Sequence, residues 1–270
     1  MLIYITLIIT LYVFVNKFLI NKLLFYPNTN IPYIISSDDD LKSELGQDVT
    51  LREVPISYTD SNNHIILNAL YLSNPSKPVT IIYSHGNAGN IYYRLNAITS
   101  LGKYGSVIAY DYRGFGKSTH HSTIETCKYD LDAVIQYVLK QGVLAENIVL
   151  FGESLGVAIT SQIAPLYDIK AVILDSGFSS IRDVIFDKLG YFSHIITLLF
   201  TNDISTIHNL LQIDSDKITL IHSNTDNVLS INNMHRILSQ LKCKYHVKSG
   251  DHMNKDYLNK LDNICVSLNN

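Results

Sequence analysis

A serine between two glycines is the strongest candidate for chemistry in this chain of 270 residues. It is Ser154, in the run Gly-Glu-Ser-Leu-Gly at 152–156. An apolar β-type run, 148–151, leads into the motif, and a helix-compatible run, 157–164, follows it. Small residues beside the serine allow a strand to turn sharply into a helix, which presents the hydroxyl above the C-terminal edge of a sheet. The pattern therefore predicts that Ser154 is a nucleophile.

A serine hydroxyl is a weak nucleophile at neutral pH, so it needs a base, and the base needs a carboxylate to orient it. Of the ten histidines, His252 is favoured because it lies in a polar loop between the last expected strand and the last expected helix. For the acid we favour Asp226, which follows the β-type run 217–221. Asp175, which follows 171–174, is the alternative because it also ends an expected strand.

A second cluster of small residues follows another expected strand. The apolar run 79–83 is followed directly by Ser-His-Gly-Asn-Ala-Gly-Asn at 84–90. Small residues let the backbone turn its N–H groups toward a charge that develops on a carbonyl oxygen. We expect the backbone N–H groups of Asn87 and Leu155 to form this oxyanion hole.

The elements that must position these residues alternate between strand and helix. Two β-type runs, 51–58 and 64–72, come first and predict an antiparallel hairpin at the edge of a sheet. After residue 79 apolar strands alternate with helices, which predicts an α/β fold with a mostly parallel sheet and helices on both faces. The expected strands are 79–83, 106–110, 147–151, 171–174, 217–221 and 244–248, and the expected helices are 91–103, 123–140, 155–164, 231–241 and 255–268.

The segment 179–213 is longer than a simple strand-to-strand connection needs. We expect a helical insertion that forms a short cap, and two interpretations stay open: a helix pair of the core, or a cap that binds an acyl chain. Its large apolar residues are Phe186, Leu189, Tyr191, Phe192, Ile195, Ile196, Leu198, Leu199 and Phe200.

The N-terminal segment differs from the rest in composition. Residues 1–15 hold no charge, and two polar pairs, Asn16 with Lys17 and Asn21 with Lys22, interrupt the apolar character before Pro27. We expect a single-pass transmembrane anchor at 1–26 and a catalytic domain at 27–270, with a signal peptide and a core helix as alternatives. The lysines on the C-terminal side favour a cytosolic catalytic domain. Because Pro27 and a polar connector follow, we expect the domain to fold without the anchor.

Composition excludes several function classes. The formal net charge is −3, and Lys and Arg are scattered, so a nucleic-acid partner is disfavoured. The three cysteines, Cys127, Cys243 and Cys265, have neither metal-ligand spacing nor an even count. We expect no cofactor and no metal.

Together the motifs resemble those of an α/β-hydrolase. The resemblance rests on His-Gly-Asn-Ala-Gly-Asn at 85–90, Asp-Tyr-Arg-Gly-Phe-Gly-Lys-Ser at 111–118, the serine motif, Asp226 and His252. More narrowly, the chain resembles the membrane-anchored α/β-hydrolase-domain proteins related to the yeast bud-emergence protein family. The resemblance implies Ser154 as nucleophile, Asp226 as acid and His252 as base. It also implies action on acyl esters or thioesters, since some relatives remove palmitate from proteins.

Three positions depart from the pattern of that family. Val157 stands where relatives usually carry another glycine, which would tighten the crossing of strand and helix. Ser223 and Asp251 each replace a usual glycine, one ahead of the acid loop and the other just before the base. A carboxylate at 251 that faces inward would stabilise the protonated form of the base.

Arg113 is expected to hold carbonyls or carboxylates beneath the site.

The sequence therefore predicts a membrane-anchored serine hydrolase that cleaves an acyl ester or thioester through an acyl-enzyme. The expected substrate is a small or lipid-like acyl compound, or an acylated protein. A non-catalytic, membrane-bound binding or scaffold protein with the same fold is the alternative from another class. A serine peptidase is a further alternative, with nothing in the chain that suggests a site for a peptide terminus.

Overall fold

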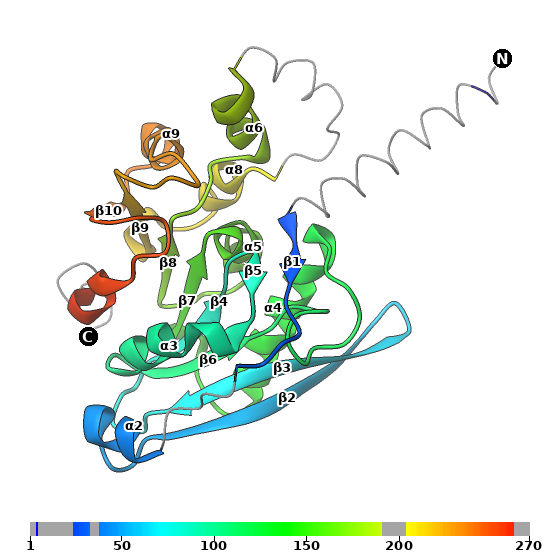
Figure 1. The fold of residues 1–270 in the computed structure, drawn as a ribbon, viewed down its shortest axis with the longest axis vertical. Coiled ribbons are helices and arrows are strands. Elements are labelled where there is room, and N and C mark those ends of the chain that lie inside the picture. Colours follow the sequence, from blue (N-terminus) through cyan, green and yellow to red (C-terminus); the bar gives the residue numbers. More distant parts are fainter. Residues whose placement is uncertain (1–3, 5–23, 33–37, 191–203, 262–270) are drawn as a thin grey trace.

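A sheet of eight strands forms the centre of the computed structural model, which describes residues 4, 24–32, 38–190 and 204–261 (Figure 1). Its strands are β2 (Thr50–Asp60), β3 (Asn63–Ser73), β4 (Thr80–Ser84), β6 (Ser106–Tyr110), β7 (Ile148–Glu153), β8 (Ala171–Asp175), β9 (Ile218–Ser223) and β10 (Lys244–Lys248). Their order across the sheet is β10-β9-β8-β7-β4-β6-β3-β2.

The sheet is parallel except at one edge, as the sequence predicts. β2 and β3 pair antiparallel as a hairpin, and β3 pairs antiparallel with β6. The hairpin turns at Ser61 and Asn62, whose φ angles of 48° and 70° are those that a tight two-residue turn requires. All other neighbours are parallel, which brings the C-terminal ends of β4, β7, β8 and β9 to one side.

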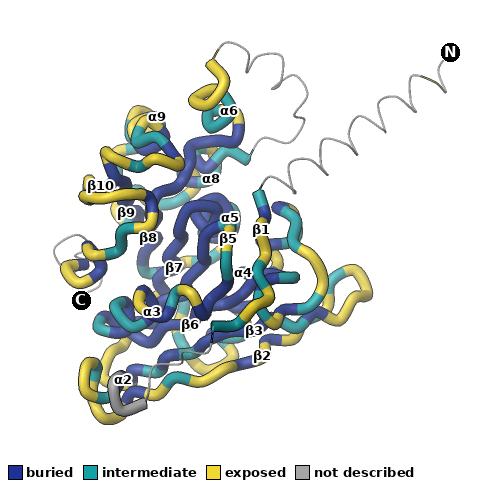
Figure 2. The backbone as a smooth tube through the Cα atoms, viewed as in Figure 1, coloured by how far each residue is buried: buried dark blue, intermediate teal, exposed yellow. Residues whose placement is uncertain are grey.

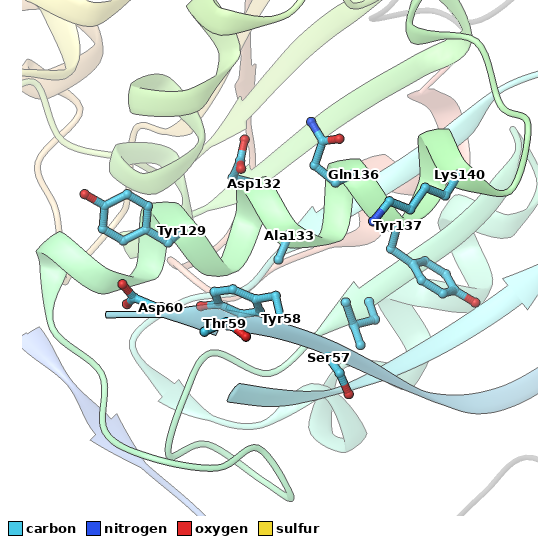
Figure 3. Close-up of a pocket in the computed structure, with 11 residues that line it drawn as sticks. Ser57, Tyr58, Thr59, Asp60, Tyr129, Asp132, Ala133, Gln136, Tyr137 and Lys140 are labelled. Atoms are coloured by element: carbon cyan, nitrogen blue, oxygen red, sulfur yellow. The ribbon is translucent and has the colours of Figure 1, made fainter. Parts of the chain in front are cut away.

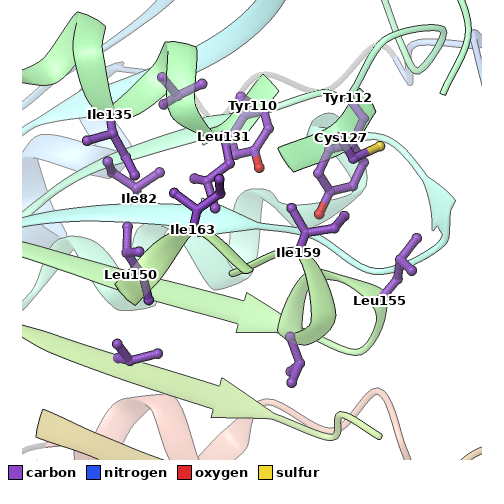
Figure 4. Packing of buried hydrophobic residues seen from close by; sticks show 14 of the residues in the cluster. Ile82, Tyr110, Tyr112, Cys127, Leu131, Ile135, Leu150, Leu155, Ile159 and Ile163 are labelled. Carbon is purple, nitrogen blue, oxygen red and sulfur yellow. The ribbon is translucent and has the colours of Figure 1, made fainter. Parts of the chain in front are cut away.

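Alternate residues of the central strands bury their side chains on opposite faces of the sheet. In β7, Leu150 packs into one core, and Val149 and Phe151 pack into the other. α4 (Ile124–Lys140) and α5 (Leu155–Ile163) cover the first face (Figure 4). α9 (Asn232–Gln240) packs on the same face. The second face is covered by α2 (Asp38–Leu45), α3 (Leu95–Gly102) and the 3₁₀ turn η6 (Asp256–Lys260). Figure 2 shows the central strands buried, whereas β2 and the tip of the hairpin carry most of its exposed residues.

Two helical predictions are met only in part. The helix expected at 91–103 starts as a 3₁₀ turn, η1 (Ile91–Arg94), and continues as α3. The helix expected at 255–268 is η6 within the described residues, and positions 262–270 lie outside them. The remaining short 3₁₀ turns are η2 (Ala145–Asn147), η3 (Ala164–Leu166) and η5 (Ser215–Lys217).

The expected cap contains two helices that the structure describes. α6 (Ile181–Leu189) begins at the N-cap Ser180, whose hydroxyl accepts the N–H of Asp183 at 3.0 Å. α8 (Thr206–Leu210) packs against α5. The expected apolar residues between 191 and 203 lie outside the described residues.

The end of the expected anchor belongs to the folded domain. β1 (Tyr26–Pro27) pairs in parallel with β5 (Ala88–Gly89), and Phe25 is 8% exposed within the core. Residues 24–26 therefore contact the folded domain, although the expected domain boundary lies after residue 26. Residues 1–3 and 5–23 lie outside the described part. Within the described ranges, no helix has both the length and the hydropathy needed to cross a bilayer.

Candidate active site

Ser154 lies at a sharp turn between β7 and α5. Its φ and ψ are 54° and −112°, a conformation that is strained for a residue with a side chain. A Cβ atom at Gly152 would lie 2.7 Å from the carbonyl oxygen of Gly156, and one at Gly156 would collide with the carbonyl oxygen of Ser84. The glycines on both sides of the serine therefore let strand and helix cross closely, as the motif predicts.

The structure brings the three predicted side chains together. Ser154 Oγ lies 3.0 Å from His252 Nε2, and His252 Nδ1 lies 2.7 Å from Asp226 Oδ2. Ser154 and His252 are 8% and 5% exposed, so both are accessible only from one side. The serine follows β7, the aspartate follows β9 and the histidine follows β10, which places all three at the C-terminal edge of the sheet.

The charge state of Asp226 fixes which imidazole nitrogen carries the proton. Burial alone would raise the pKa of this carboxyl, but hydrogen bonds from His252 and from the N–H groups of Leu229 and Val228 hold it below the usual range. An ionised carboxylate can only accept, so His252 Nδ1–H donates to it. His252 Nε2 is then free to accept the proton of the serine hydroxyl.

The two predicted oxyanion residues lie beside the serine. Asn87 and Leu155 both line a pocket that also contains Ser154. Neither backbone N–H donates a hydrogen bond to another of the described residues. The loop passes close to the serine turn, since a Cβ atom at Gly86 would lie 3.4 Å from Ser154 Cβ. Both N–H groups therefore remain available for a substrate oxygen.

Two pockets meet at the serine. The first has a volume of 490 Å³ and is mainly apolar, with walls from the N-terminal segment, α6 and the loop after β9. Its apolar lining residues are Leu24, Leu155, Phe178, Ile181, Val184, Ile185, Leu189, Val228 and Leu229. The second, of 450 Å³, lies on the side of the oxyanion loop and includes Tyr93, Arg94, His252 and Met253.

Comparisons with known proteins agree with this geometry. The α/β hydrolase fold family matches residues 79–193. An uncharacterized protein of Acanthamoeba polyphaga mimivirus is 35% identical over 190 residues, which are 64% of each chain. Protein bem46 of Schizosaccharomyces pombe is 27% identical over 59% of this chain and 55% of its own length. The Pyrococcus furiosus esterase Pf2001 has a TM-score of 0.67 at 17% identity, over 88% of this chain and 98% of the esterase.

The matched family region contains the predicted oxyanion loop and the serine turn. The chain has the α/β-hydrolase fold, and its sequence resembles members of the α/β-hydrolase superfamily. The similarity to bem46 confirms the resemblance to the bud-emergence family. The matched stretches span less than two thirds of both curated relatives. The likeness to the esterase, at 17% identity, is one of fold.

The carboxylate of Asp175, the alternative acid, has two lysines as its charged partners. Its side chain is fully buried and pairs with Lys248 at 2.8 Å and also with Lys255. Burial would raise the pKa of the Asp175 carboxyl, but the two lysines hold it below the usual range. Lys248 Nζ also donates a hydrogen bond to the backbone carbonyl oxygen of His252 at 3.3 Å. The backbone N–H of Ser154 donates to the backbone carbonyl oxygen of Asp175 at 2.8 Å. Asp175 therefore supports the loops that carry base and nucleophile.

Glu153, next to the serine, is part of the same buried network. It accepts a hydrogen bond from Tyr83 and lies 3.3 Å from Arg94 and 3.4 Å from Lys255. Burial opposes its charge, but Lys255 and Arg94 outweigh this effect and lower the pKa of the carboxyl to about 2. Sequence analysis missed this network. The charged residues at the ends of apolar strands were its only signal.

Arg113 holds carboxylates, as the sequence predicts, and its partners Asp60 and Tyr58 belong to the hairpin strand β2. Its guanidinium donates to Asp130 and to Asp60, each at 2.7 Å, and to the hydroxyl of Tyr58.

His85 in the oxyanion loop is fully buried, and burial and the nearby Arg94 lower its pKa to about 4. His85 is therefore a neutral structural residue.

The three departures from the family pattern have structural explanations. Val157 packs on Gly177, where any Cβ atom would collide with the valine side chain. The hydroxyl of Ser223 donates to the carbonyl of Gly250, which links the acid loop to the base loop. Asp251 is exposed and accepts the N–H of Met253 at 3.1 Å, so the inward-facing arrangement does not occur.

A further hollow of 330 Å³ lies between β2 and α4 (Figure 3). Its lining is a mixture of tyrosine, acidic and neutral side chains from the hairpin and the helix, including Tyr58, Asp60, Tyr129 and Asp132. It contains none of the three residues of the site described above. We therefore assign the chemistry to the two pockets at Ser154.

Proposed function

We propose that this protein is a serine hydrolase that cleaves an acyl ester or acyl thioester through an acyl-enzyme. The observation that carries the proposal is the chain of contacts from Ser154 through His252 to Asp226, at 3.0 and 2.7 Å, where an apolar pocket opens on the serine. The family and the esterase-like fold support the class of enzyme.

The reaction begins when Ser154 Oγ attacks the acyl carbonyl carbon. His252 Nε2 takes the hydroxyl proton as the new C–O bond forms, and Asp226 stabilises the imidazolium. The negative charge on the carbonyl oxygen is met by the N–H groups of Asn87 and Leu155. When the carbonyl re-forms, the bond to the alcohol or thiol breaks, and His252 returns its proton to the leaving group.

A water molecule completes the cycle. His252 accepts a proton from the water as the water oxygen attacks the acyl-enzyme, and it returns that proton to Ser154 Oγ when the carboxylic acid leaves. The apolar pocket would hold the acyl chain, because its walls are leucine, isoleucine, valine and phenylalanine side chains. The second pocket, on the other side of the serine, would take the leaving group.

We also propose that residues 1–23 attach the enzyme to a membrane as a single-pass segment. Support comes from the sequence, since residues 1–15 carry no charge and only Lys17 and Lys22 follow before residue 24. Alkaline carbonate extraction of membranes from cells that express the full chain tests this proposal. Retention in the pellet is expected, and complete release into the supernatant would refute the attachment.

A substrate panel tests the proposed reaction. Wild type and Ser154→Ala are compared on esters and thioesters of increasing acyl length. The wild type should release acid from long-chain substrates, and Ser154→Ala should lose turnover by several orders of magnitude. Equal rates for the two proteins would end the enzyme proposal.

A pocket variant tests where the acyl chain lies. Ile185→Phe narrows the apolar pocket and should reduce turnover of long-chain substrates while sparing an acetyl ester. Leu166→Phe, at a 69% exposed position outside that lining, is the matched control and should resemble wild type. If Ile185→Phe keeps the chain-length profile of wild type, the acyl chain binds elsewhere.

A further inference from the structure

The N-terminal segment of the described chain crosses the oxyanion loop. The N–H of Tyr26 donates to the carbonyl oxygen of Asn87 at 2.9 Å, and that of Asn28 donates to Gly89 at 3.4 Å. Pro27, between them, has no N–H, but in a parallel pair only alternate residues face the partner strand. Figure 1 shows β1 and β5 side by side. Residues 24–28 are called the strap below.

Side chains hold the residues on either side of Asn87: His85 Nδ1 lies 2.7 Å from the carbonyl oxygen of Gly86, and Arg94 donates to the carbonyl oxygen of Ala88 at 3.2 Å. Ala88 is exposed, and Gly86 and Gly89 have no side chains that could anchor the loop by packing. Among the described residues, Tyr26 is the one that forms a hydrogen bond with the backbone of Asn87: its N–H donates to the Asn87 carbonyl oxygen. The strap therefore provides the hydrogen bond to the backbone of Asn87 itself, whereas side chains hold the residues next to it.

The strap is itself fixed to the domain at both ends. At its start, Phe25 is 8% exposed and meets the ring of Phe115 edge-on, with centroids 6.3 Å apart. At its end, the buried amide of Asn90 donates to the carbonyl oxygens of Asn28 at 2.8 Å and Asn30 at 2.9 Å. Because both ends of the strap are fixed to the domain, its hydrogen bonds can hold the oxyanion loop in place.

We propose that the strap is a working part of the active site, in which the N–H of Tyr26 positions the oxyanion donor Asn87. The inference rests on the proposed function, because it concerns a charge that develops only during acyl transfer. An oxyanion donor acts on the transition state, so a displaced donor lowers kcat and leaves KM almost unchanged. Tyr26 is a positioning residue here, since it acts through Asn87.

Two substitutions of Tyr26 distinguish the contribution of its backbone N–H from that of its side chain. In the full chain, Tyr26→Pro removes the N–H, and Tyr26→Ala keeps it while removing a ring that is 54% exposed. On a short soluble ester, Tyr26→Pro should lower kcat on the order of 10- to 100-fold with KM within about twofold. Tyr26→Ala, which keeps the N–H, should retain a kcat at least about tenfold higher than that of Tyr26→Pro. Equal kcat in the two variants would overturn the proposal.

A second variant covers the case in which Tyr26→Pro does not fold. Asn90→Ser keeps a side-chain oxygen that can accept the N–H of Tyr92, the capping bond made by Asn90 at 3.1 Å, but loses the amide donors to the strap. It should show the same loss in kcat with little change in KM. Wild-type kcat in a folded Asn90→Ser variant would count against the strap.

Hydrogen exchange separates failure of the strap from failure of the proposed function. The peptide 85–91 should exchange faster in Tyr26→Pro or Asn90→Ser than in Tyr26→Ala, whether or not the protein turns over an ester. Unchanged exchange refutes the strap. A wild type that shows no turnover while the exchange difference is present refutes the proposed function and confines the strap to a structural role.

Discussion

Asp226 and Asp175 both end strands of the sheet, yet their carboxylates face different partners. Asp226 accepts a hydrogen bond from His252, whereas Asp175 lies between Lys248 and Lys255. From sequence alone the two positions look alike, because the lysines that distinguish them are more than 70 residues away from Asp175 along the chain. The distinction depends on which side chains the folded sheet brings together.

This difference predicts two kinds of damage. Asp226→Asn should lower kcat by roughly 10⁴-fold with little change in stability, because the imidazole loses the acceptor that orients it. Asp175→Asn should instead lower the free energy of unfolding by about 3–5 kcal/mol, because it leaves buried lysines unpaired. Ester kinetics and denaturant unfolding of both variants check this. A catalytic loss in Asp175→Asn that equals that in Asp226→Asn would reverse the assignment of the acid.

The same residues determine how the activity depends on pH. The pKa of Asp226 is held below its usual range, so this carboxylate stays ionised at neutral and mildly acid pH. kcat/KM should fall toward acid pH, because the base must be neutral to accept the serine proton. Asp251→Asn should leave this profile unchanged, since its carboxylate faces the N–H of Met253. A shifted acid limb in Asp251→Asn would show that Asp251 acts on the ring.

At the scale of elements, the turn from β7 to α5 and the end of β8 fit one another. Val157 in α5 occupies the space in which Gly177 would carry a side chain. The sequence shows the valine where relatives usually carry glycine, but the glycine that accommodates it is 20 residues away and reveals itself only in the packing.

A double-mutant cycle tests this fit. Gly177→Ala alone should lower the free energy of unfolding by about 1–3 kcal/mol, because the new methyl group collides with Val157. In a Val157→Gly background the same substitution should cost little, so the two changes should couple. Thermal or denaturant unfolding of the four proteins gives the coupling energy. Strict additivity would mean that the two residues do not constrain each other.

For the molecule as a whole, the sequence predicts the sheet and its C-terminal edge well because buried parallel strands are long apolar runs. The loops at 84–90, 152–156 and 249–254 are therefore placed correctly. β1 is different, since a two-residue strand has no periodicity and its partner is some 60 residues away. For this reason the sequence predicts neither the pairing of β1 with β5 nor the contact of residues 24–26 with the domain.

The position of the domain boundary can be measured. A chain that begins at Leu24 should remain soluble and folded, because it keeps the strap and the buried Phe25. A chain that begins at Asn28 should lose several kcal/mol of stability, since a buried phenylalanine and the pairing of β1 are removed. Thermal unfolding and sedimentation compare the two. Equal stability would place the boundary after residue 26.

The central claim is that Ser154 is the nucleophile. The most direct measurement is the intact mass of the full chain after treatment with a fluorophosphonate, followed by peptide mapping. One adduct should form, on the peptide that contains Ser154, and it should be absent in Ser154→Ala although that variant unfolds at the same temperature as wild type. An unlabelled wild type, or an adduct that persists in Ser154→Ala, would contradict the account.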